Sequence, residues 1–116
     1  MVHEEKKVGK IIEELTMFFF AIGADKIQTG IEKSDKQVVI EFKANFNPEY
    51  ADRVERLNQF LNEEKNEGME DIYWELAGSG DPGETSQLLL VGMMIEKADV
   101  CVRETEVELR LYKEML

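Results

Sequence analysis

The fold of this chain is decided by residues 27–43, IQTGIEKSDKQVVIEFK, where apolar and polar side chains alternate on both sides of a Ser34-Asp35 turn. A period of two residues is typical of β-strands that bury one face, and the polar pair between the two runs favours a reversal of the chain. The stretch therefore predicts a β-hairpin. The positions that share its apolar face are Ile27, Thr29 and Ile31 before the turn and Val38, Ile40 and Phe42 after it.

A second hairpin is predicted near the end of the chain, from alternating apolar residues between positions 100 and 111. A helix precedes each hairpin. Residues 8–22 repeat apolar side chains every three or four positions up to Gly23, and residues 84–97 form another apolar segment. The linking sequence GADKI after the first helix is echoed by KADV at 97–100. The two ends of the chain thus resemble one helix–hairpin unit used twice.

The middle of the chain is predicted to be helical. Asn47-Pro48 supplies an N-cap and a proline at the first helical position, so a helix should follow to about Lys65. A short third helix is expected over residues 69–77, and Asp81-Pro82 then opens the fourth. The order α-β-β-α-α-α-β-β predicts an α/β (α+β) two-layer sandwich, with a mixed four-stranded sheet and helices on one face. The chain should form one domain over residues 1–116, with residues 1–6 frayed.

The composition describes an acidic globular domain. Its 14 Lys and Arg against 25 Asp and Glu give a net charge of −11, while 43% of the residues are apolar. That charge disfavours nucleic acid and anionic lipid as partners, because both are negatively charged. The polar start fits neither a signal peptide nor a transit peptide, and no apolar run approaches the roughly 20 residues of a membrane helix. We therefore expect a cytoplasmic protein.

Few residues suggest chemistry. Cys101 is the only cysteine and His3 the only histidine, so no internal disulfide, zinc cluster or Ser-His pair is expected. Carboxylate clusters could serve acid–base catalysis or bind magnesium, but such clusters are usually solvated faces. The sequence thus predicts no catalytic residue, no metal site and no cofactor.

One glycine-rich loop, residues 78–83, precedes the fourth helix. Backbone N–H groups around Gly78, Gly80 and Gly83, together with the positive end of the helix, could bind a phosphate. No lysine follows the glycines, however, and the carboxylate of Asp81 would repel a phosphate. A flexible connector is therefore favoured, and the three glycines stay candidates for cofactor binding.

The feature that stands out is a surplus of apolar side chains. On the first helix two of them fall off the core stripe, and the fourth helix is apolar all round. Some of this surface should mark a protein interface or line a pocket. The alternative is that the fourth helix lies at the centre of the helical layer. The interface candidates are Met17, Phe20, Leu90, Met93 and Met94.

The order of elements and several residues resemble the histidine-kinase-like ATPase fold (GHKL, Bergerat). Residues 11–24, IIEELTMFFFAIGA, are similar to the first helix and turn of that family. Residues 39–42, VIEF, with Asn47-Pro48-Glu49, resemble the strand and loop before its second helix. Residues 78–95 and the closing hairpin resemble its lid, last helix and final hairpin.

The nucleotide-site residues of that family are replaced here. Glu14 matches the motif glutamate, but Phe18 stands where the family has a magnesium-binding asparagine, and Ala44 falls where it has an adenine-reading aspartate. Both glycines of the adenine loop are also replaced, around Phe46 and Pro48. The resemblance therefore implies an ATPase-like fold that has lost its nucleotide site, in which Glu14 is a relic.

These observations predict a non-catalytic regulatory or protein-interaction module that assembles with itself or with another protein. The alternative is a small-ligand binding protein, with a nucleotide among its candidate ligands, that uses the cleft between the 78–83 loop and the first helix. An enzyme that uses paired carboxylates is the third possibility.

Overall fold

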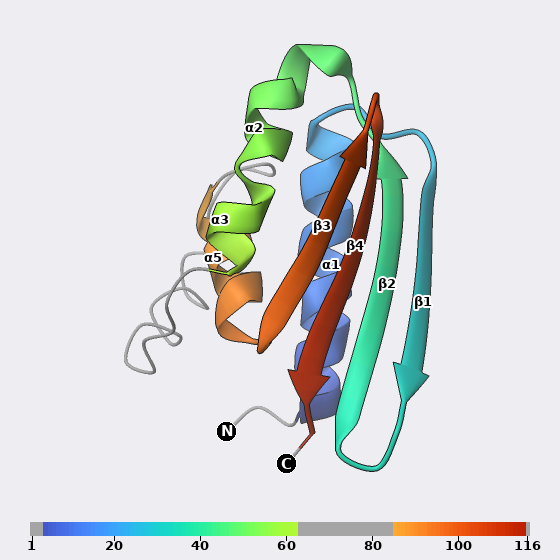
Figure 1. Ribbon diagram of the computed structural model, residues 1–116, viewed down its shortest axis with the longest axis vertical. Helices are drawn as coiled ribbons and strands as arrows, with labels where there is room; N and C mark the ends of the chain where they lie inside the picture. The colour runs from blue at the N-terminus through green and yellow to red at the C-terminus, as the bar shows by residue number, and fades with distance from the viewer. Residues whose placement is uncertain (1–3, 63–84, 116) are drawn as a thin grey trace.

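The computed structural model describes residues 4–62 and 85–115, and all structural statements below concern these residues. They form an α+β fold with a four-stranded sheet and helices (Figure 1). The helix predicted over 69–77 and the 78–83 loop lie outside the described residues.

The first helix, α1 (Glu4–Ala21), forms because its apolar residues recur with helical spacing and bury one face. It begins at Glu4, so residues 4–6, which the sequence predicts to be frayed, are helical. It ends at Ala21, two residues before Gly23, whose φ of 94° is one that glycine adopts without strain. A Cβ at this position would also lie 2.8 Å from the Asn47 Cβ. Both the backbone angle and the lack of space therefore require glycine here.

Both predicted hairpins are present. The first pairs β1 (Ile27–Lys33) with β2 (Gln37–Asn45), and the second pairs β3 (Lys97–Arg103) with β4 (Glu106–Glu114). The inner strands β2 and β4 join the hairpins, which gives the order β1-β2-β4-β3. Every pairing is antiparallel, so the prediction of a mixed sheet is wrong. The hairpins meet through strands that run in opposite directions, and no parallel pair arises.

The single helix predicted after Asn47 is three short elements: η1 (Pro48–Tyr50), α2 (Ala51–Glu55) and α3 (Leu57–Leu61). The predicted cap is correct, because Asn47 Oδ1 accepts a hydrogen bond from the Glu49 N–H at 3.0 Å. The break falls at Arg56, and the following α3 contacts β3.

The last helix, α5 (Thr85–Met93), ends before the predicted Lys97 because that residue already begins β3. It packs between α1 and α3.

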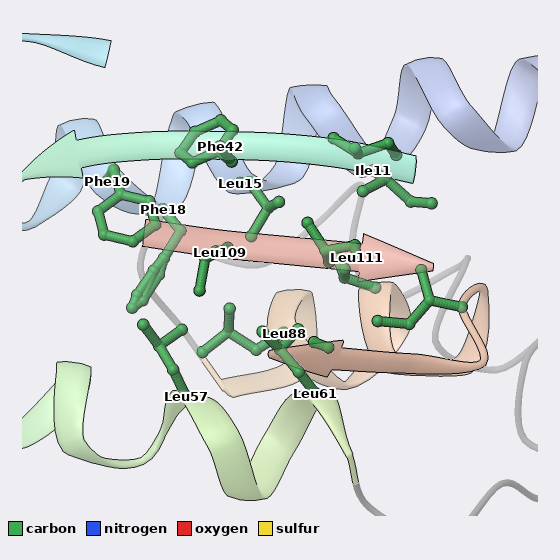
Figure 2. Packing of buried hydrophobic residues seen from close by; sticks show 14 of the residues in the cluster. Ile11, Leu15, Phe18, Phe19, Phe42, Leu57, Leu61, Leu88, Leu109 and Leu111 are labelled. Atoms are coloured by element: carbon green, nitrogen blue, oxygen red, sulfur yellow. The ribbon is translucent and has the colours of Figure 1, made fainter. Parts of the chain in front are cut away.

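The core lies between the helices and the inner face of the sheet. Strands β2 and β4 alternate buried and exposed residues along their length, so one sheet face is covered and the other meets solvent. Figure 2 shows Leu15 of α1 pointing toward Leu109 of β4 and Phe18 pointing toward Leu57 of α3. The Phe19 ring lies 5.4 Å from the Phe42 ring of β2, a distance typical of packed aromatic pairs.

Candidate interaction surface

The two outer strands of the sheet differ in whether other groups cover their free edges. The start of the β3 edge is blocked by α3 and Asn62, whereas Val102 near the end of the strand is 45% exposed. The Asn62 side chain that follows α3 donates to the Ala98 carbonyl at 2.9 Å and accepts from the Ala98 N–H at 2.8 Å. An amide side chain thus replaces a neighbouring strand, and Ala98 is buried beneath it. Covering an edge in this way prevents another chain from pairing with it.

The edge of β1 is open. Within the parts of the chain that the structure describes, no group outside β2 hydrogen-bonds to the β1 backbone. From Gln28 to Lys33 every residue of β1 is exposed, although Thr29, Ile31 and Lys33 lie on the same face as the core residues of β2. Ile31 is 53% exposed, which is high for an isoleucine on the inner face of a sheet. The helices therefore leave β1 uncovered.

The hydrogen-bonding register shows which backbone groups of β1 are free. The Lys26 carbonyl accepts from the Asn45 N–H at 3.3 Å, and the Ser34 N–H donates to the Gln37 carbonyl at 2.9 Å. In an antiparallel ladder alternate residues direct both backbone groups toward the same neighbour. The even-numbered residues of β1 therefore face β2. The odd-numbered residues, Ile27, Thr29, Ile31 and Lys33, direct their N–H and C=O groups to the open edge.

Helix α1 also exposes a phenylalanine. Phe18 points toward α3 and Phe19 packs on β2, and each further helical residue rotates about 100°. Phe20 therefore lies on a different side of α1 from Phe18 and Phe19, and it is 56% exposed. We call Ile27, Thr29 and Ile31 of β1 the β1 edge surface. Met17, 41% exposed, lies on the solvent side of the helix.

The interface candidates predicted from the sequence divide between the two helices. Met17 and Phe20 are exposed as expected. Leu90 and Met94 are buried, with 0% and 3% exposure, so their assignment to an interface is wrong. Met93 is half-buried. The reason is that α5 lies between α1 and α3, the alternative that the sequence left open. No pattern in the sequence indicated that Ile31 would be exposed instead.

Glu14, the residue that matches the family glutamate, is buried on α1. Its Oε1 contacts Lys10 Nζ at 2.8 Å, while Oε2 is buried and has no hydrogen-bond partner among the residues that the structure describes. Burial lowers the pKa of Lys10, but the hydrogen bond and charge of Glu14, with the charge of Glu13, outweigh it, so the pKa is raised. The candidate glycines Gly78, Gly80 and Gly83 lie outside the described residues.

The open face of the sheet is a charged, solvated surface. Arg110 contacts Glu41 at 2.6 Å and Lys43 contacts Glu108 at 3.5 Å, each pair bridging β2 and β4. The hydrogen bond from Arg110 lowers the pKa of Glu41, and the same bond raises the pKa of Arg110. Cys101 is exposed on this face, as predicted. Such cross-strand pairs stabilise a sheet modestly and point to no ligand.

Over residues 4–62 and 85–115, no three His, Cys, Asp or Glu side chains lie close enough together to hold a metal ion. None of the described helices has the length and apolar character needed to cross a bilayer. Comparison of the chain with protein families, with curated proteins and with solved structures finds no match.

Proposed function

We propose that this chain is a non-catalytic protein-interaction or regulatory module of the cytoplasm. In this proposal it has a two-layer α/β sandwich of order α-β-β-α-α-α-β-β that resembles the histidine-kinase-like ATPase fold, and it has lost nucleotide binding. It self-associates, or binds another protein, through the apolar surface that its helices leave exposed.

The positions that replace the nucleotide-site residues support the loss of nucleotide binding. Phe18 and Ala44 are buried with the hydrophobic core, where Phe18 lies 5.3 Å from the Phe19 ring. Ala44 occupies the inner face of β2, opposite Val107 of β4. A magnesium ion or an adenine ring needs polar groups at its site, and these two side chains fill the core instead.

The observation that carries the proposal is the β1 edge surface. It combines an open strand edge with the exposed side chain of Ile31, and Phe20 of α1 adds a second exposed apolar side chain to the molecule. Natural domains usually cover or charge such an edge, because unpaired backbone groups next to apolar side chains promote association. An edge that is left open in this way is suited to a partner.

The experiment is a thermal-shift screen with ATP, ADP and GTP, with and without magnesium, beside light scattering at several protein concentrations. We expect no nucleotide shift and a mass that rises with concentration. A ligand at 100 times its Kd would add roughly 2.7 kcal/mol of stability, which such a screen detects. Phe20→Ser should lower the association without unfolding the protein, since Phe20 is exposed. A strict monomer that captures no protein partner would contradict the proposal.

A small-ligand binding protein is the second candidate, and the buried Oε2 of Glu14 favours it. A buried acceptor without a partner costs about 1–3 kcal/mol, and a ligand that donates a hydrogen bond would remove that cost. A nucleotide-dependent shift that Glu14→Gln abolishes would favour this candidate over the interaction module.

A further inference from the structure

We infer that the partner of the β1 edge surface is a second copy of this chain, paired antiparallel through β1 with the two-fold axis at Thr29. The inference deepens the proposed function and rests on it, since it names the partner and the contact. Two four-stranded sheets would join into one continuous sheet, with both copies of β1 at its centre.

The free backbone groups restrict where the axis can lie. Two antiparallel strands bond through residues that both direct their N–H and C=O groups across the gap. On β1 these are the odd-numbered residues, so an odd-numbered residue must lie opposite another odd-numbered one. An axis at a single residue satisfies this requirement. An axis midway between two residues does not.

Side-chain complementarity selects Thr29 among these axes. With the axis there, Thr29 lies opposite Thr29, Ile27 opposite Ile31 and Lys26 opposite Glu32 of the second copy. Asp25, just before the strand, lies opposite Lys33. Thr–Thr, apolar and opposite-charge pairs are the cross-strand combinations that stabilise antiparallel sheets.

Neighbouring axes lose this complementarity. With the axis at Gly30, Ile27 lies opposite Lys33, and Asp25 lies opposite Asp35. With the axis at Ile31, Lys26 lies opposite Lys36. Like charges directly opposite one another destabilise a sheet pair.

Three of the four charged groups that this register uses are available, while the fourth, the Asp25 carboxylate, also accepts a hydrogen bond from Asn45 Nδ2. Lys26, Glu32 and Lys33 are exposed, and none of them has an ion-pair partner within residues 4–62 and 85–115. Ile27 and Ile31 of both copies would form one apolar strip on the inner face. In a two-fold symmetric dimer each of these contacts occurs twice, because the same surface of both copies forms the interface.

The first experiment exchanges charges across the predicted contact. Lys26→Glu and Glu32→Lys should each weaken the dimer roughly tenfold by light scattering, since each places two pairs of like charges opposite one another. The double variant should restore the dimer to within roughly threefold of the original, because the pairs are re-formed with reversed sign.

A change in the net charge of the chain cannot by itself produce this pattern of weakening and rescue. Glu32→Lys makes the chain less negative, so a dimer limited only by general repulsion would become tighter. Weakening by this substitution, together with rescue in the double variant, supports the β1 contact. If the wild-type dimer tightens or stays unchanged with Glu32→Lys, the inference is overturned and the proposed self-association still stands. If the wild-type protein is a monomer, the inference and the proposed self-association are both overturned.

The second experiment reads the register by disulfide formation in a Cys101→Ser background, with Cys101 exposed and far from β1. Thr29→Cys should form a dimer under mild oxidation, because facing residues of a hydrogen-bonded pair have Cα atoms about 5.5 Å apart, within disulfide range. Ile31→Cys should not, since the two copies of residue 31 would lie about 13 Å apart along the strands. Cross-linking through residue 31 but not residue 29 would overturn the Thr29 axis.

Discussion

The two halves of the molecule, α1-β1-β2 and α5-β3-β4, are built alike and protected differently. Each is a helix followed by a hairpin with a seven-residue outer strand and a nine-residue inner strand. In the second half α3 packs against the outer strand β3 and Asn62 caps the backbone of Ala98, although Val102 near the end of the strand is 45% exposed. In the first half the outer strand β1 has neither cover nor cap among the described residues.

The difference follows from where the intervening helices lie. The segment between the halves places α3 against β3 and α5, on the opposite edge of the sheet from β1 (Figure 1). Helix α1 reaches Phe42 of β2 through Phe19, but Ile31 of β1 stays exposed. One helical segment thus protects one edge, and the repeated unit by itself protects neither.

The largest effect is expected from breaking the cover of the second half. A Cβ at Gly92 of α5 would lie 2.7 Å from the Phe60 carbonyl oxygen of α3, a backbone atom that cannot turn aside. Gly92→Ala should therefore lower the free energy of unfolding by about 3 kcal/mol. Gly9→Ala in α1 is the matched control, because no described atom lies within 4 Å of its Cβ and it should stabilise by about 0.5–1 kcal/mol. Urea unfolding measures both, and equal effects would contradict close α3–α5 packing.

The next effect concerns the capped edge. Asn62→Ala leaves the N–H and C=O of Ala98 without their partner and should cost about 2 kcal/mol in urea unfolding. It also makes the edge of β3 resemble that of β1, so new association should accompany the loss. Asn58→Ala is the control, since the exposed Asn58 contacts Asn62 but not β3, and it should cost less than about 0.5 kcal/mol. A stable monomeric Asn62→Ala variant would show that the cap does not protect the edge.

The smallest effect tests a contact between the halves. Lys113, buried on the inner face of β4, contacts Glu4 of α1 at 2.5 Å. Burial raises the pKa of Glu4, but the hydrogen bond and charge of Lys113, aided by Lys7, outweigh it and lower the pKa below 4.5. The ionised form therefore stabilises the fold above the unfolded-state pKa, and this contribution disappears as the pH falls through the lower folded-state pKa.

Glu4→Gln should accordingly cost about 0.5–1 kcal/mol at pH 7, and the difference from wild type should shrink as the pH falls through the lowered pKa of Glu4. Glu5→Gln is the control from the same helical turn, because Glu5 is exposed. A difference that persists unchanged at pH 3 would assign the loss to packing instead of charge. Unfolding by denaturant at several pH values measures this.

Local patterns predicted much of the fold. The alternation at Val38, Ile40 and Phe42 identified a strand and its buried face, and the structure buries all three. Asn47 was identified as a cap, and the outward position of Cys101 followed from its place between apolar neighbours. These features depend on residues close in sequence, so the local pattern of apolar and polar residues is sufficient to predict them.

Features that depend on distant residues were predicted less well. The break between α2 and α3 falls at Arg56, and no local signal in the sequence marks it. The apolar surface of α5 looked available because its own sequence cannot show that α1 and α3 flank it. Met17 and Phe20 were assigned to the surface correctly because they fall off the stripe of their own helix.

The sequence by itself determined the two hairpins with their preceding helices, the buried face of the inner strands and the near-repetition of helix and hairpin, because these follow from spacing along the chain. Only the tertiary structure decided that β2 and β4 join the hairpins, that α3 covers β3, and that β1 keeps an open edge. The physical reason is that alternation specifies which side chains share a face, whereas the neighbour of a strand depends on contacts between segments far apart in the chain. The charges along β1 belong to the sequence, but their role as a self-complementary contact arises only because that strand lies at the edge.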